Sequence, residues 1–261
     1  MGERRNVGIT ESLAPGFNSI TEKKIFAAFV IEVLLSFIIM FSVLEYTNIL
    51  SSITGAILLL AVVAAVLLIA QPFITYIIIS TYYKKAKRTK PKQFTKVYLK
   101  LISVMILQII IVAAPLIAIF VGMWVPFTFY GNTLLSGLAG GLFIIFGIAL
   151  GIALVLFLEI KLVFSFQELI IKNKGVWDSI RYSYRDTKNK FWKLVWFVFI
   201  FGILAVILNT AINYLIGYDG SAYSAPTLLV YASVFIESVI DSYISISLLV
   251  GITDYFIRAL G

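Results

Sequence analysis

The chain contains neither cysteine nor histidine. Without cysteine, disulfides, thiolate metal sites and cysteine nucleophiles are excluded. Without histidine, the chain also lacks the commonest general base and the commonest metal ligand in proteins. Zinc hydrolases, haem proteins and serine–histidine–aspartate triads are therefore excluded, and the sequence has no glycine-rich phosphate loop. It predicts a protein that is not an enzyme and that carries no metal or organic cofactor.

Charged residues are scarce as well, at 13% of 261 residues, whereas 61% are hydrophobic. A soluble domain has no interior large enough for so many apolar stretches, so most of the chain is expected to lie in lipid. Six apolar runs are long enough to cross a bilayer, at 25–46, 53–83, 101–121, 134–158, 194–216 and 227–252. The predicted fold class is all-α: a polytopic integral membrane bundle of six transmembrane helices, in three antiparallel hairpins with interfacial amphipathic helices. Residues 159–174 are expected to continue the fourth helix.

The basic residues occupy only four parts of the chain, at 4–24, 84–100, 161–193 and Arg258. Because six spans separate these blocks, all basic residues are predicted to face one side, which the positive-inside rule makes cytoplasmic. The sequence thus predicts a multi-pass plasma membrane protein with both termini in the cytoplasm. The predicted basic face comprises Lys84, Lys85, Lys87, Arg88, Lys90, Lys92, Arg181, Arg185, Lys188 and Lys190.

One basic, aromatic segment occurs twice, at 8–27 and again 167 positions later at 175–194. A degenerate third copy lies at 91–101, and each copy precedes an apolar run. This spacing predicts a single membrane domain, 1–261, built from hairpin units at 1–83, 84–160 and 161–261.

The doubled segment is expected to form a short helix along the membrane interface in each copy, with Leu13, Phe17 and Ile20 of the first copy entering lipid. A second repeated feature is an acid followed four residues later by a base. It occurs at Glu168 with Lys172 and at Asp254 with Arg258, and this spacing favours an ion pair on a helix.

Polar residues follow one side of the sixth span in spite of its apolar surroundings. They are Glu237, Ser238, Asp241, Ser242 and Ser245. Carboxylates at this depth are costly, so they either line a proton or cation path or form a protonated cluster that holds helices together. Asn209 of the fifth span is expected at the level of Glu237, and Glu32 of the first span is a third acidic candidate for the path.

The segment 164–204 has an acid leaving a helix, then a glycine, spaced serines and a basic approach to an apolar run. Its defining residues are Glu168, Gly175, Ser179, Ile180, Ser183 and Lys190. This pattern resembles YciC-like proteins and the membrane domain attached to some glycerophosphodiester phosphodiesterases. The resemblance implies a membrane fold and no reaction, because the phosphodiesterase activity of that family lies in a separate soluble domain.

Two functions follow as hypotheses. The first is a channel-like or transport subunit in which the polar residues of the sixth span line the path. The second is a membrane scaffold or assembly subunit whose basic face docks anionic lipid, a protein partner or nucleic acid. The interleaved aromatic residues of 177–193 suit lipid headgroups better than nucleic acid bases. The expected partners are therefore anionic headgroups, with a protein partner or a second copy of the chain as alternatives.

Overall fold

The computed structural model describes the chain outside residues 1–9, 46–52, 88–93, 131–137, 217–227 and 261. The described part is almost entirely helical, with short turns between helices and no strand. Its elements are α1 (Thr10–Asn18), η1 (Ser19–Thr21), α2 (Lys23–Glu45), α4 (Ile53–Lys87), α5 (Phe94–Tyr130), α6 (Leu138–Leu162), α7 (Ser165–Ile170), α8 (Val176–Asp186), α9 (Phe191–Ile216) and α10 (Leu228–Leu260).

Six of these helices, α2, α4, α5, α6, α9 and α10, are long and apolar enough to cross a membrane. The predicted all-α class with six spans is therefore confirmed. Consecutive spans contact each other, α2 with α4, α5 with α6, and α9 with α10. The connections within these pairs lie outside the described residues, so the hairpin arrangement stays a prediction.

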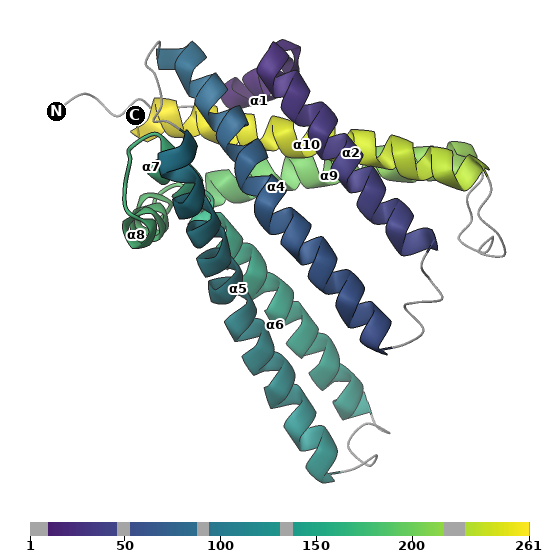
Figure 1. The fold of residues 1–261 in the computed structure, drawn as a ribbon. Helices are drawn as coiled ribbons and strands as arrows, with labels where there is room; N and C mark the ends of the chain where they lie inside the picture. Colours follow the sequence, from purple (N-terminus) through teal and green to yellow (C-terminus); the bar gives the residue numbers. More distant parts are fainter. Residues whose placement is uncertain (1–9, 46–52, 88–93, 131–137, 217–227, 261) are drawn as a thin grey trace.

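The long helices diverge from one end of the molecule, which carries α1, α7, α8 and the last turns of α10 (Figure 1). The buried apolar clusters lie at this end, around Phe164, Leu101 and Ile78. Farther along the spans, large apolar side chains such as Phe146 and Val206 face outward. Lipid tails are as apolar as these side chains, so no hydrophobic force draws the outer halves together. Tight packing is concentrated where the helices leave the apolar zone.

The first copy of the doubled segment forms α1, but its apolar residues do not enter lipid as expected. Leu13 and Phe17 pack on the cluster between α9 and α10, and the Phe17 ring lies 5.1 Å from that of Phe201. Ile20 packs on the cluster beneath α2. The reason is Gly16, where an added Cβ would lie 2.5 Å from the Ser247 carbonyl oxygen. Lacking a side chain there, α1 approaches the backbone of α10 directly.

One further expectation, about helix continuity, is wrong. The fourth span does not continue as one helix to residue 174, because α6 ends at Leu162 and α7 begins at Ser165. Within the degenerate third copy at 91–101, the described residues from Phe94 onward form the first turns of the long helix α5. The division of the chain into three units stays a prediction.

Candidate anion-binding site at the basic end

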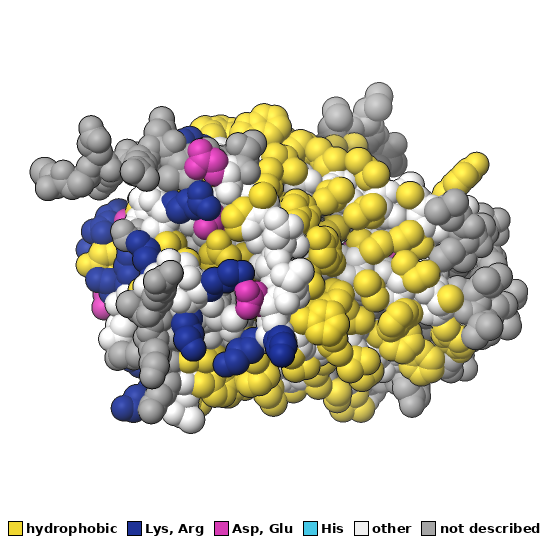
Figure 2. Space-filling model, turned by 90° about the horizontal axis from the view of Figure 1, so that it is seen from above, with side chains coloured by type: hydrophobic (Ala, Val, Ile, Leu, Met, Phe, Trp, Pro, Cys, Tyr) yellow, Lys and Arg dark blue, Asp and Glu magenta, His cyan; other side chains and the backbone are white. Residues whose placement is uncertain are grey.

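Lysine and arginine side chains gather at the end from which the spans diverge, and apolar side chains cover most of the remaining surface in Figure 2. Within the predicted basic face, Arg88, Lys90 and Lys92 lie outside the described residues. Its described members come from two elements and the segment after them. Lys84, Lys85 and Lys87 end α4, Arg181 and Arg185 belong to α8, and Lys188 and Lys190 follow α8.

Helix α8 is the most clearly amphipathic element at this end. Ser179, Ile180 and Ser183 form its buried side, where Ile180 joins the apolar cluster that includes Leu101. Its outer side carries Arg181 and Arg185, which are exposed and four positions apart, so they share one face of the helix. The sequence of this short helix therefore directs its cations away from the core.

Ser183 attaches α8 to the place where α6 stops. Its Oγ donates to the Lys161 carbonyl oxygen at 2.8 Å and accepts from the Phe164 N–H at 3.0 Å. Both partners are backbone groups that the break between α6 and α7 leaves without helical partners. The hydroxyl thus completes the end of α6 and fixes Lys161 beneath α8.

A cavity of about 650 Å³ lies between this end of α6 and α8. Four cationic side chains and one carboxylate line it, together with two tyrosines: Lys161, Arg181, Arg185, Lys188, Asp178, Tyr182 and Tyr184. Arg185 stacks on the Tyr182 ring at 4.3 Å and contacts Asp186 at 3.3 Å. The cavity therefore carries a clear excess of positive charge.

Lys161 is the unusual member of this group, because only 7% of its surface is exposed. Its Nζ lies 5.5 Å from the centre of the Phe157 ring, 4.9 Å from that of Tyr184 and 5.5 Å from that of Phe191. Within the described part of the chain, this ammonium has no hydrogen bond and no ion pair. Aromatic faces offset part of the cost of desolvation, but a buried cation without a counter-ion remains costly.

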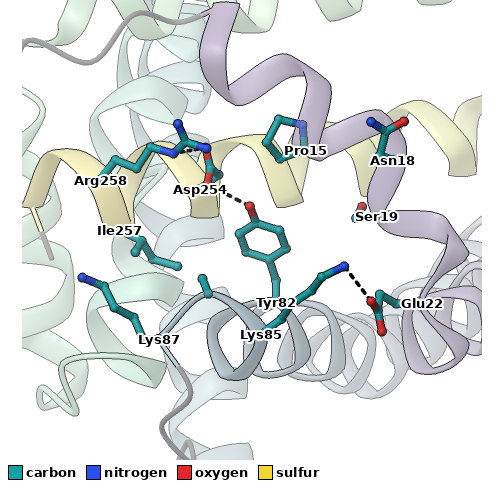
Figure 3. A pocket seen from close by; sticks show the side chains of 11 residues that line it. Pro15, Asn18, Ser19, Glu22, Tyr82, Lys85, Lys87, Asp254, Ile257 and Arg258 are labelled. Carbon is teal, nitrogen blue, oxygen red and sulfur yellow. Dashed lines mark hydrogen bonds and ion pairs between the residues drawn. The ribbon is translucent and has the colours of Figure 1, made fainter.

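A second cavity, of about 600 Å³, lies between α1, α4 and α10 (Figure 3). Here Asp254 accepts hydrogen bonds from Ser12 and Tyr82 and pairs with Arg258, each at 2.8 Å. Lys85 contacts Glu22 at 2.6 Å. The expected pairs Asp254–Arg258 and Glu168–Lys172 both form, the latter at 3.1 Å. The charged side chains of this cavity largely neutralise one another.

The polar residues of the sixth span do not all face the same surroundings. Ser238 and Ser242 are buried, Glu237 is half-buried, and Asp241 and Ser245 are exposed. Neither cavity at the basic end is lined by any of them.

The partner of Asn209 on the sixth span differs from the expected one. Asn209 donates to Asp241 at 3.0 Å, one helical turn beyond Glu237, so the expected meeting of Asn209 with Glu237 is wrong in its partner. The expectation assumed equal depth for the two helices, and a one-turn offset along the helix axes accounts for the difference. The buried Glu32 carboxylate lies beside Ser245.

Helices α6, α7, α8, α9 and α10 are consecutive in the chain, and α8 contacts the end of α6. Residues 138–259 match the family model for the membrane domain of glycerophosphoryl diester phosphodiesterase. The match includes the segment 164–204, so the resemblance to that membrane domain is confirmed there. It concerns the membrane part of an enzyme family and decides nothing about catalysis. Comparison with curated proteins and with solved structures finds no match.

Sequence reasoning did not select Lys161 as a site residue. The signal for it is modest: it is the first base of the third basic block and directly follows an apolar run. Its burial depends on Ser183 and Tyr184, more than twenty positions later, which no local pattern connects to it. The arginines of α8, by contrast, were expected on the basic face because they lie within the third basic block.

Proposed function

We propose that this chain is a non-catalytic membrane scaffold whose basic end binds anionic phosphate headgroups. The observation that supports it is the cavity beneath α8, with four cations and one carboxylate, at the end where basic residues gather. Each lysine or arginine near an anionic membrane surface contributes about 1 kcal/mol of attraction. Arginine also matches phosphate with two parallel hydrogen bonds. In this proposal the basic end lies at the cytoplasmic side of the plasma membrane.

The experiment is a lipid titration of the purified chain in neutral detergent, followed by thermal unfolding. Phosphatidylglycerol should raise the melting temperature, and phosphatidylcholine should not. The triple variant Arg181→Gln, Arg185→Gln, Lys188→Gln should bind phosphatidylglycerol on the order of 100-fold more weakly, from about 1 kcal/mol for each charge. Salt at about 1 M, where the screening length is about 3 Å, should weaken wild-type binding in the same direction. Equal stabilisation by both lipids would contradict the proposal.

The orientation has its own test. Reporter tags after Ser51, Asn132 and Ser221 should report the outside, and tags after Thr89 and at either end of the chain the cytoplasm. The four internal insertion points lie outside the described residues. A cytoplasmic signal from any of the first three would contradict the six-span topology with a cytoplasmic basic end.

A transport function is the second candidate, and the buried Glu32 carboxylate beside Ser245 favours it. A carboxylate inside a span is a natural group for a proton or cation path. Against it, Asp241 already binds Asn209, and Ser238 donates to the Val234 carbonyl of its own helix at 2.8 Å. The double variant Glu237→Gln, Asp241→Asn separates the alternatives in reconstituted vesicles. Loss of proton or cation flux in a folded variant supports transport, whereas equal or higher stability with unchanged function supports helix packing.

A further inference from the structure

We infer that the cavity beneath α8 holds the phosphate of one membrane phospholipid, bound at Lys161, with the lipid's hydrocarbon chains lying along the outer surface of α6 and α9. This inference rests on the proposed headgroup-binding function and deepens it. The proposed function needs only a basic surface, whereas this inference assigns one lipid to one buried lysine.

The first argument is the missing counter-ion. Lys161 is 7% exposed, and within the described residues it has no acidic partner. Lys188 lies close enough to act on Lys161 by electrostatic repulsion. Asp178 is the single carboxylate of the cavity, facing four cations. An anion in this cavity would supply the charge that the protein itself leaves out.

The second argument is the apolar, aromatic surface that lies next to the Lys161 ammonium. The Phe157 and Phe191 rings lie 5.4 Å apart, each 5.5 Å from the Lys161 ammonium, and Phe157 is itself exposed on the outer surface of α6 and α9. Beyond this ring pair, that surface is apolar and exposed at Leu156, Trp192 and Trp196. Tryptophan prefers the level of the headgroups. A phosphate at Lys161 therefore lies where a lipid headgroup lies, with an apolar surface directly next to it.

These features favour a lipid over other anions. A free phosphate would gain nothing from the apolar surface beyond Phe157 and Phe191. An acidic peptide or a nucleic acid would meet Arg181 and Lys188 on the outside before it reached a lysine with 7% exposure. Only a ligand that enters from the membrane with its own apolar part uses both the cation and the aromatic surface.

The experiment uses the full chain carrying Lys161→Met, which keeps the unbranched apolar stem and removes the charge. Native mass spectrometry counts phosphatidylglycerol and phosphatidylcholine retained after detergent exchange, and thermal unfolding gives the affinity. Wild type should retain one phosphatidylglycerol, and Lys161→Met should bind it at least about 10-fold more weakly, which is about 1.4 kcal/mol. Lys100→Met, at an exposed lysine of α5 outside the cavity, is the matched control and should bind as wild type does.

The melting temperature without lipid is a second measurement. It distinguishes a lipid-binding lysine from a purely structural one, whose removal would lower the melting temperature. Removing an uncompensated buried charge should leave the lipid-free melting temperature of Lys161→Met equal or higher. A lower melting temperature would show that the lysine holds the aromatic rings together, and would overturn the inference. Stabilisation by inorganic phosphate at the same concentration as phosphatidylglycerol would overturn the lipid as its source.

The two proposals fail in different ways. If Lys161→Met binds phosphatidylglycerol like wild type while the triple variant of α8 and Lys188 loses it, the basic end binds headgroups and the buried site is wrong. If neither variant loses binding, both proposals are wrong.

Discussion

Helices α1 and α8 attach to the bundle in related ways but leave different surroundings behind them. Gly16 and Ser183 occupy the same position in the two copies of the doubled segment, 167 residues apart. Gly16 contacts the backbone of Ser247, and Ser183 contacts the backbone of Lys161, two residues that are 86 positions apart. The same separation of 86 relates Asp254 to Glu168. Gly16 brings α1 directly onto the backbone of α10, whereas Ser183 reaches the backbone of α6 through its hydroxyl. A single side chain at one position therefore changes how closely the helix approaches.

The charges beside the two helices differ in the same sense. Beside α1, the carboxylates of Asp254, Glu22 and Glu11 contact Arg258 or Lys85. Beneath α8, Asp178 is the one acid among four cations. The comparison shows how related attachments give a self-neutralised contact in one place and an anion-binding cavity in the other.

The largest expected effect on the free energy of unfolding is that of removing Asp254, the acid beside α1, compared with removing Asp178, the acid beneath α8. Asp254→Ala leaves the hydroxyls of Ser12 and Tyr82 without their common acceptor, so it should lower the free energy of unfolding by about 1–3 kcal/mol for each of the two donors. Asp178→Ala should change it by less than about 1 kcal/mol, the value of an acid in the first turn of a helix. Chemical unfolding in detergent measures both. Similar losses for the two variants would remove the distinction between the cavities.

The close approach of α1 gives the next effect. Gly16→Ala places a Cβ 2.5 Å from the Ser247 oxygen, so it should cost about 1–3 kcal/mol as overpacking. Gly202→Ala in α9 is the control, because nothing lies within 4 Å of a Cβ there. It should be neutral or stabilise by up to about 1 kcal/mol through helix propensity. An equal fall in melting temperature for Gly16→Ala and Gly202→Ala would contradict the close approach of α1 to α10 at Gly16.

The third expected effect concerns the hydrogen bonds through which Ser183 attaches α8 to the end of α6. Ser183→Ala removes the bond to the Lys161 carbonyl and leaves the Phe164 N–H without its acceptor, a loss of about 1–3 kcal/mol. Ser103→Ala is the control, since that hydroxyl bonds only to the Leu99 carbonyl of its own helix at an exposed position. Hydrogen exchange of the α8 amides should rise in the first variant alone. Unchanged exchange there would show that apolar contacts hold α8 without Ser183.

The smallest effect concerns the exposed ion pair beside α1. Lys85 and Glu22 are close, at 2.6 Å, but their side chains are 60% and 40% exposed. Solvent screens such pairs, so Lys85→Met should change the free energy of unfolding by no more than about 1 kcal/mol. A loss comparable to that of Asp254→Ala would show that the ion pair, and not the buried acid, holds this end together.

The sequence predicts the parts of the structure that depend on local pattern. Apolar runs locate the six spans, charge blocks locate the basic end, and the four-residue spacing predicts the Asp254–Arg258 pair. It does not predict contacts that depend on how helices meet. Phe17 looks interfacial until α10 is placed beside it, and Lys161 looks like any basic residue at the end of a span until α8 covers it. Asn209 binds Asp241 because of an axial offset that hydropathy cannot report.

The hydrogen bond from Ser12 to Asp254 joins residues 242 positions apart. A ribosome releases Asp254 only after the five preceding spans have been made, so α1 has no partner on α10 for nearly the whole of synthesis. Phe17 can contact Phe201 once α9 has been made, whereas Ser12 and Gly16 gain their neighbours only with α10. The contact between α1 and α10 can therefore form only after α10 has been made, and it is then that Asp254 gains its hydrogen bond from Ser12.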